Sequence, residues 1–478
     1  MAIIGAGLGS LSAAAILAKK GLSVAILEQN YLPGGCTSSY LRKGYIFETG
    51  ATTLVGLDEG MPLRAVLDMA GIEFNAEKLE IPMQVHLKNG EIITRFQNRG
   101  RWIEEAGRVF GKSGQKEFWE QCFHLSDFVW NTSVKQKRFP PQNLSDLLYC
   151  AYKSSPGDML NARFAYKSIF QLLKKYELHK NREFIDFVNE QLKITAQNNV
   201  YEVNALFGAT ALCYTNYGNY YMHGGLIHLI KAFTDSIAIN GGKLFLKTTV
   251  NHIEKLGNSW KISTNKGDVI AKNIISGVPV NNLTKLIDGA LLPAFIQKKT
   301  MPVSKLNGAV QLGIAFKSSN VNEVLHHQIH HDLELGFKGS NSIFISYSST
   351  TDTQRAIQGI TLASVSTHVS DLENSKVNKE VFKEKVIEKL ASVGLLKLED
   401  IVYTHVSDPH DWQDWTLREA GFVGGYPQFQ SVLPWQMIPA RLSKSLYVCG
   451  DSVYPGQGIP GVALSGMLAA ERLLTDFN

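Results

Sequence analysis

The chain opens with AIIGAGLGSLSAAAILAKKGLSVAILE, residues 2–28. An apolar run, a glycine-rich turn, a helix-forming stretch and a second apolar run follow one another, which is the order of a βαβ mononucleotide-binding unit. Gly5 permits the tight turn, and Gly7 lets the backbone approach a pyrophosphate. A helix beginning near Gly9 would present the positive end of its dipole to the phosphates. These residues predict an α/β fold with a Rossmann-type dinucleotide site.

Two further residues refine this prediction. Ser10 stands where a third glycine is usual, and a residue this small still lets helix and strand pack closely. Glu28 ends the second apolar run, where its carboxylate would accept hydrogen bonds from an adenosine ribose and repel a 2′-phosphate, which disfavours NADP. A chance glycine-rich turn does not account for all of these parts in order. We expect the dinucleotide to contact Gly5, Gly7, Leu8, Gly9, Ser10, Glu28 and Gln29.

The other end of the chain carries a second glycine-rich segment, SLYVCGDSVYPGQGIPGVALSGMLAAERLL, residues 445–474. It predicts a strand at Leu446–Cys449 and a helix from about Pro460, because proline suits the first helical turn. Free amides of Gly461 and Val462 at this helix end can stabilise negative charge, such as that of a reduced flavin. Small residues would let the helix lie close to a cofactor, namely Ala463, Ser465 and Gly466.

Family resemblance identifies the cofactor. The segment from Glu28 through Gly34 and Gly35 resembles the E-x-x-x-x-x-G-G segment of FAD enzymes related to amine oxidases and carotenoid desaturases. In that family the glycine pair runs beneath the FAD pyrophosphate, and the following segment reaches the flavin ring. Family members often have arginine where this chain has Cys36, so the resemblance leaves that phosphate contact without a residue.

The C-terminal run GDSVYPGQGIPGV, residues 450–462, resembles the signature of the phytoene desaturase, carotenoid isomerase and retinol saturase superfamily. Residues 221–254 resemble the family's helix and strand in which Val250 lies against the adenine, and Phe422–Pro427 resembles its substrate-proximal Gly-Gly turn. The resemblance covers the whole chain in order and implies non-covalent FAD. It adds as cofactor contacts Gly35, Cys36, Thr37, Gly50, Val250, Gly450, Asp451, Gly458, Ile459, Pro460, Gly461 and Val462.

The resemblance also implies the domain organisation. We expect a discontinuous Rossmann-type FAD-binding domain, glutathione-reductase-like and amine-oxidase-related, built from residues 1–85, 220–280 and 435–478. An α+β substrate domain would comprise 86–219 and 281–434. Within it, helical patterns fill 103–195, whereas apolar and polar residues alternate in QLGIAF, SIFISY and TLASVS between 305 and 370, which predicts antiparallel sheet.

The function implied by this family is carotenoid desaturation, in which the flavin accepts a hydride from a saturated C–C bond of an acyclic or monocyclic carotenoid. We assign no catalytic side chain, and expect Met222, His223 and Tyr426 to line a substrate tunnel. The motifs also fit a cis–trans isomerase or a saturase. A non-catalytic binding protein resembling GDP-dissociation inhibitors is less favoured, because both cofactor-binding ends are intact.

Composition limits which partners and which compartment we expect for the protein. A net charge of +5 permits weak attraction to anionic lipid without implying nucleic acid. The five cysteines show neither disulfide nor metal-ligand spacing, which suits a reducing compartment. Histidines of HHQIHHD, residues 326–332, are interpreted as a polar loop or edge strand rather than a metal site. We expect a cytoplasmic protein, peripheral on the inner face of the cell membrane, with oxygen or quinone as electron acceptor.

Residues 160–180 predict a basic amphipathic helix, which could pack on its own core or lie at a lipid surface. No apolar run approaches the ~20 residues needed to cross a bilayer. Trp412, Trp415 and Trp435 could line a lipophilic tunnel, although core packing is the usual role of such residues.

Overall fold

A computed structural model of the chain describes residues 1–317 and 324–477. Its first sheet has the strand order β10-β2-β1-β14-β21-β20, parallel except at its last pair. The strands are β10 (Lys243–Phe245), β2 (Ala25–Leu27), β1 (Ala2–Ile4), β14 (Ile274–Ser276), β21 (Leu446–Val448) and β20 (Arg441–Ser443). This order confirms the Rossmann-type domain, because strands from both ends and the middle of the chain lie side by side.

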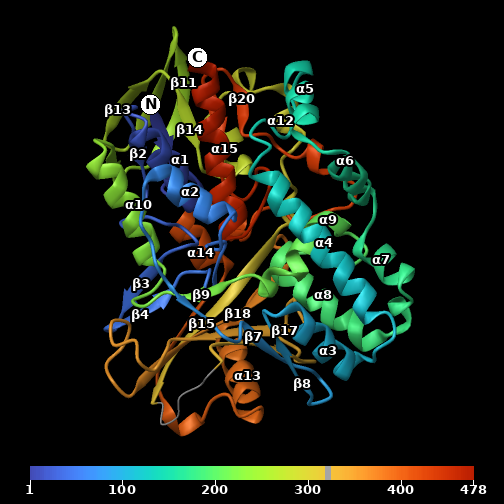
Figure 1. The fold of residues 1–478 in the computed structure, drawn as a ribbon. Helices are drawn as coiled ribbons and strands as arrows, with labels where there is room; N and C mark the ends of the chain where they lie inside the picture. Colours follow the sequence, from blue (N-terminus) through green and yellow to red (C-terminus); the bar gives the residue numbers. More distant parts are fainter. Residues whose placement is uncertain (318–323, 478) are drawn as a thin grey trace.

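Helices cover one face of this sheet, and a small antiparallel sheet covers the other (Figure 1). Ile3 packs on one side with four helices, whereas Ala2 and Ile4 pack on the other with a small antiparallel sheet, as expected for a buried parallel strand. The helices are α1 (Leu8–Lys19), α2 (Pro62–Ala70), α10 (Ile227–Ile239) and α15 (Ile459–Phe477). The small sheet comprises β11 (Val250–Leu256), β12 (Ser259–Thr264) and β13 (Gly267–Ala271), next to α11 (Val280–Leu286) and α12 (Ala294–Gln297).

A second, seven-stranded sheet has the order β19-β15-β18-β17-β16-β7-β8. Its strands are β19 (Ile401–Ser407), β15 (Asn307–Lys317), β18 (Ile360–Ser370), β17 (Ser342–Tyr347), β16 (His326–His330), β7 (Met83–His86) and β8 (Ile92–Arg95). All neighbours are antiparallel except β16 and β7, so the antiparallel sheet predicted between 305 and 370 is confirmed. The structure places β7 in this sheet, although the range we assign to the FAD-binding domain ends at residue 85.

A group of helices packs against β7 and β8 of the second sheet. The helical prediction for 103–195 is confirmed by α3 (Arg99–Phe110), α4 (Gln115–Ser133), α5 (Leu144–Lys153), α6 (Pro156–Ala162), α7 (Ile169–Lys175) and α8 (Arg182–Ala196), with α9 (Ala205–Leu212) after them. The opposite face of the second sheet carries α13 (Lys379–Ser392), and α14 (Pro409–Thr416) follows β19. Short strands complete the fold: β3 (Ser39–Arg42) with β4 (Tyr45–Glu48), and β5 (Leu54–Val55), β9 (Asn219–Tyr221) and β6 (Glu77–Lys78).

The single helix predicted over 160–180 is wrong. The segment is divided into the end of α6, a 3-10 turn at Arg163–Tyr166 and α7. Ser168 caps α7 by accepting from the amide of Gln171, and Ile169, Leu172 and Leu173 are buried in the helical core. The interruption arises because Ser168 starts a new helix with its own capping box.

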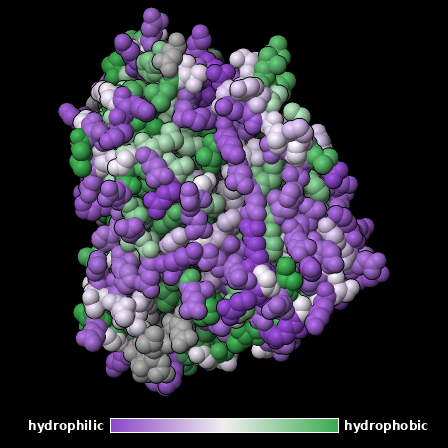
Figure 2. All heavy atoms as spheres, in the orientation of Figure 1, coloured by the Kyte–Doolittle hydropathy of each residue, from purple (hydrophilic) through white to green (hydrophobic). Residues whose placement is uncertain are grey.

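Large apolar side chains are exposed on α5, on α6 and on the 3-10 turn that follows α6. Figure 2 shows hydrophobic surface where these helices lie at the edge of the molecule in Figure 1. We call this the α5–α6 surface, and its exposed residues are Leu144, Leu147, Leu148, Tyr152, Met159, Leu160 and Tyr166. Within the described ranges, none of the helices combines the length and the apolar character that a membrane span requires.

Candidate functional site

Two cavities meet at the centre of the molecule. The smaller, of about 270 Å³, is lined by the glycine-rich segments of the first sheet, and we call it the glycine cavity. The second, of about 430 Å³, lies between the second sheet and α4, α8 and α9, and we call it the large cavity. Four residues line both cavities, namely Cys36, Thr37, Asp451 and Val462. The two spaces are therefore continuous at one junction.

The N-terminal motif forms one wall of the glycine cavity. Gly5 adopts a positive φ of 81° in the turn after β1. Gly7 precedes α1 and has no atom within 4 Å of the position its Cβ would take. The first turn of α1 has neither a side-chain cap nor an acidic residue, so its amides and dipole face the cavity uncompensated. This geometry fits a diphosphate, as the sequence predicts.

Glu28 lies in the same cavity and is held by backbone amides. Its Oε2 accepts from the amide of Ala6 at 2.6 Å and its Oε1 from the amide of Asn30 at 2.7 Å. Burial raises the pKa of the carboxyl, and these amides oppose the shift. Each oxygen retains a second lone pair for a ribose hydroxyl. Gln29 instead donates to the carbonyl of Trp415 at 2.6 Å and holds the end of α14 against the cavity.

The Gly-Gly segment crosses the junction. Gly34 donates its amide to the carbonyl of Ala6 at 2.7 Å and forms a parallel bridge with Gly7, so the segment lies directly on the first turn. Cys36 follows at the boundary of the two cavities, and burial raises the pKa of its thiol. The thiol is therefore neutral and offers no positive charge to a phosphate.

An arginine that the motif analysis did not single out lies beside this cysteine. Arg418 is buried, lines the glycine cavity and pairs with both carboxylate oxygens of Asp451 at 2.6 and 2.7 Å. The predicted ligand Asp451 is thus already engaged. Arg418 brings positive charge to the junction where Cys36 brings none. The sequence run REAGFVGG contains this arginine, but a lone arginine before a glycine pair carries no spacing signal.

The C-terminal helix begins one residue earlier than predicted. α15 starts at Ile459, and the amide of Val462 donates to the carbonyl of Gly458 at 2.9 Å. The prediction that the Val462 amide is free is therefore wrong, because this bond is the first of the helix. The small residues also have another role: a Cβ on Gly466 would lie 2.1 Å from the carbonyl oxygen of Gly9, so they let α15 pack on α1.

Every residue predicted to contact the cofactor lines one of the two cavities. The three predicted tunnel residues do not line either of them. Met222 packs against the core of the first domain, His223 pairs with Glu77 at 2.7 Å near the surface, and Tyr426 donates its hydroxyl to Asn281. Unpredicted lining of the glycine cavity comes from Thr248, Thr249, Gly277, Val278, Pro279, Asn282, Lys285 and Trp415–Arg418.

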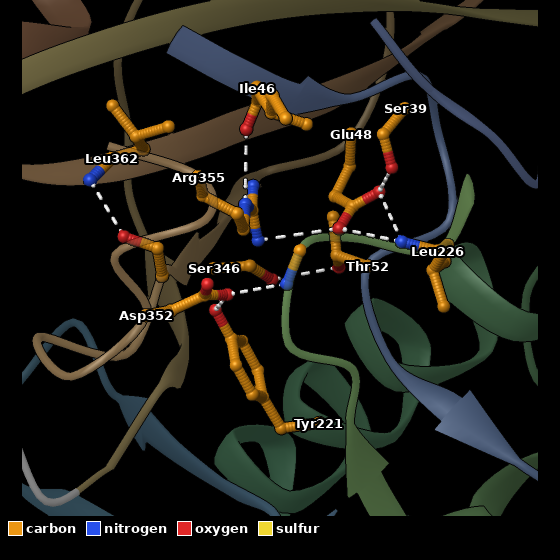
Figure 3. Close-up of polar contacts among 12 residues, drawn as sticks. Ser39, Ile46, Glu48, Thr52, Tyr221, Leu226, Ser346, Asp352, Arg355 and Leu362 are labelled. Atoms are coloured by element: carbon orange, nitrogen blue, oxygen red, sulfur yellow. Dashed lines mark hydrogen bonds and ion pairs between the residues drawn. The ribbon is translucent and has the colours of Figure 1, made fainter. Parts of the chain in front are cut away.

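A buried polar network fixes the wall between the sheets (Figure 3). Arg355 lies 3.3 Å from the Oε1 of Glu48, and the carboxylate also accepts from Ser39 and from the amide of Leu226. Asp352 accepts from the hydroxyl of Tyr221 at 2.7 Å. The loop before β18 is thereby tied to β4, to β9 and to the start of α10, next to Thr49–Thr53, which line the large cavity.

The histidines of HHQIHHD are buried in an interior strand, so their interpretation as a polar loop or edge strand is wrong. β16 lies between β17 and β7 and hides their rings from water. His326 contacts Ser346 at 2.8 Å, while His327 contacts His86 at 3.2 Å on the other side. Within residues 1–317 and 324–477, no three metal-binding side chains converge in a way that could hold an ion.

The fold and the joined cavities define a dinucleotide-binding oxidoreductase with a separate space for a second ligand. The family described as flavin-containing amine oxidoreductase matches residues 11–474, and the chain belongs to it. It is an FAD-dependent oxidoreductase.

Relatives and solved structures both match the chain over nearly its whole length. The chain is 25% identical to a chloroplastic prolycopene isomerase of Daucus carota, over 100% of this chain and 80% of the relative. It is 24% identical to a 4,4'-diapolycopen-4-al dehydrogenase of Metabacillus indicus, over 100% and 97%. A putrescine oxidase variant superposes with a TM-score of 0.66 at 15% identity, and a Pyrococcus furiosus protein with 0.64 at 18%, each over 99% of this chain and 98% and 97% of the other. These structures share the fold.

Proposed function

We propose that the chain oxidises a carbon–carbon bond of a carotenoid-like polyene. The observation that supports this most directly is the large cavity, which is mainly apolar and opens onto the glycine cavity at the predicted flavin end. Bound FAD supplies two-electron chemistry there. The relatives named above carry polyene substrates in their names, which favours a lipophilic chain for this cavity as well.

The chain's own residues would place both ligands. The first turn of α1 and the Gly34–Gly35 segment would hold the diphosphate, Glu28 the ribose, and Val250 would lie against the adenine. The start of α15 and the Arg418–Asp451 pair would lie beside the flavin, whose ring would close the near end of the large cavity. Helices α4, α8 and α9 would then exclude water from the polyene, which is their main contribution to the reaction.

An amine substrate is disfavoured by the charges of the large cavity. A buried ammonium group needs a carboxylate that is not already paired. The carboxylates among the described lining residues are Asp408 and Asp451. Asp408 accepts from the amides of His410 and Asp411 and lies 3.6 Å from Lys379, and Asp451 is paired with Arg418. Neither is left for a cation.

We further propose that the α5–α6 surface docks on an anionic membrane, from which the polyene enters. Its apolar residues are accompanied by the basic side chains of Arg138, Lys153 and Arg163, which would meet lipid phosphates. A polyene partitions into bilayers, so binding at the surface shortens its path to the cavity. A peripheral, cytoplasmic position and oxygen or quinone as electron acceptor complete the proposal.

Product analysis tests the reaction. The purified flavoprotein is supplied with lycopene and γ-carotene in liposomes under air, and products are separated by chromatography and weighed by mass spectrometry. Loss of two hydrogens is the expected result. The prolycopene isomerases among the relatives favour cis–trans isomerisation as a second candidate. An isomer of unchanged mass would establish that reaction instead, and unchanged polyenes would contradict both.

A further inference from the structure

The wall that the second sheet presents to the large cavity is polar. Its other face is apolar and packs under α13 through Val310, Leu312 and Ile314. On the cavity face, Gln311 of β15 pairs directly with Ser366 of β18 on one side and Ser407 of β19 on the other. Cross-strand partners share a face, so these side chains stand together. Ala309 and His368 form the next cavity-lining pair along β15 and β18.

Several polar side chains of this cavity have no protein partner among the described residues. The side chains of Ser366, His368 and Ser407 line the cavity and make no hydrogen bond within the described chain. Neighbouring groups do find partners: Gln311 donates to the carbonyl of Glu48 at 2.8 Å.

A pure hydrocarbon is a poor match for such a wall. Buried donors and acceptors that lose water without gaining a partner cost free energy, whereas a ligand oxygen would satisfy them. A serine hydroxyl donates to a carbonyl or hydroxyl oxygen, and a neutral imidazole can donate or accept. Ser366 and His368 lie on β18 and Ser407 on β19, the two strands that flank β15, so the unpartnered groups share one wall of the cavity.

The same wall carries no charge to balance an anion. No lysine or arginine is among the described residues that line the large cavity. Burial and the nearby Lys193 lower the pKa of His368 to about 4, so its ring is neutral near pH 7. The cavity carboxylates are already paired, as described above. A carboxylate on the ligand would thus be buried with no lysine or arginine of the described lining to pair with it, which is unfavourable.

We infer that the ligand of the large cavity is a polyene bearing an uncharged oxygen function, a hydroxyl, ketone or aldehyde, held by Ser366, His368 and Ser407. This inference rests on the proposed polyene oxidation and specifies its substrate class. The apolar remainder of the cavity takes the hydrocarbon chain. An oxygen fixed against the sheet sets which carbon–carbon bond lies at the junction, so the polar wall determines the position of reaction.

The test compares three polyenes of equal chain length in detergent micelles: a hydrocarbon, a terminal ketone and a terminal carboxylate. Turnover with an added quinone as electron acceptor gives kcat and KM for each, and anaerobic reduction of the bound flavin shows whether each polyene is oxidised at all. The ketone is expected to exceed the hydrocarbon in kcat/KM by about tenfold or more, because a site built for a polar group rejects the analogue lacking it. His368→Leu should lower this preference, mainly by raising KM for the ketone.

Matched serines provide the control. Ser407→Ala and Ser366→Ala should each reduce the ketone preference. Ser364→Ala makes the same change on β18, at a buried serine that does not line the cavity, and should leave the preference unchanged. FAD content of each variant reports whether it folds.

The outcomes separate this inference from the proposed function. If hydrocarbon and ketone reduce the flavin equally well, polyene oxidation stands and the polar-group inference is wrong. If the carboxylate is preferred, the uncharged class is wrong. If none of the polyenes reduces the flavin, the proposed function fails and this inference with it.

Discussion

At the junction of the two cavities, Arg418 and Asp451 decide the local charge. Replacing Arg418 with Gln would leave the Asp451 carboxylate unpaired beside the predicted diphosphate. Hydrogen bonds between charged groups contribute about 1.5–3 kcal/mol, so we expect FAD affinity to fall about ten- to a hundredfold. Titration of the apoprotein with FAD, followed by flavin fluorescence, measures the change.

Two variants make this prediction specific. Adding Asp451→Asn to Arg418→Gln removes both charges and should restore much of the affinity. Arg441→Gln breaks another arginine–aspartate pair, with Asp476 at 2.7 Å, away from both cavities and should leave FAD binding unchanged. An unchanged affinity in Arg418→Gln would show that the pair serves the fold and not the cofactor.

Another buried pair, Glu48 and Arg355, supports the fold itself. Arg355→Met should lower the free energy of unfolding by about 3–5 kcal/mol, because it leaves a buried carboxylate without its partner. Burial already raises the pKa of Glu48. Such a carboxyl stabilises the folded state in its protonated form and loses that contribution as pH rises through its folded pKa, so the defect should shrink in acid. Urea unfolding at several pH values measures it; a defect independent of pH would contradict this account.

At the scale of elements, β16 makes the second sheet sensitive to acid. Burial lowers the pKa of His326 to about 3 and those of His327 and His330 to about 4. A histidine with a depressed folded pKa contributes stability above about pH 6.5 and loses it as pH falls toward 4, by about 1.4 kcal/mol per pH unit each. Urea unfolding between about pH 7 and about pH 5 should show this slope. His330→Leu, which removes one titrating ring, should reduce it; a flat profile would contradict burial of these rings.

The α5–α6 surface gives the second prediction at this scale. Burying a leucine in an apolar phase contributes about 1.5–3 kcal/mol, so the double variant Leu147→Ser with Leu148→Ser should weaken binding to anionic liposomes at least about tenfold. Cosedimentation measures the bound fraction. Leu256→Ser changes an equally exposed leucine on β11 and should have no effect. If both variants bind anionic liposomes equally well, the α5–α6 surface is not the membrane-binding surface.

Some elements could be predicted from the sequence and others could not, for physical reasons. The glycine turn after β1 and the proline in the first turn of α15 are local constraints, which a short segment displays by itself. The break at Ser168 depends on a cap that competes with an amphipathic pattern. β16 lies in the sheet interior because distant β7 pairs with it, and no residue near His327 reveals that partner.

For the whole molecule, the same distinction separates the two cavities. Motifs at fixed spacing predicted the part of each cavity that faces the expected cofactor, including Gly7–Ser10 in the glycine cavity and Gly458–Val462 in the large cavity. The rest of the large cavity is assembled from α4, α8, α9 and strands far apart in sequence, and it carries no motif. Arg418 and Arg355 were missed because each acquires its role only when a distant carboxylate is folded against it.

The central claim is that a polyene in the large cavity meets FAD bound in the glycine cavity. Anaerobic titration of the purified flavoprotein tests it most directly, with the visible absorbance of the oxidised flavin recorded after each addition of polyene or of putrescine. We predict stoichiometric bleaching by the polyene and none by the amine. Bleaching by the amine alone, or a protein that neither contains nor takes up FAD, would contradict the account.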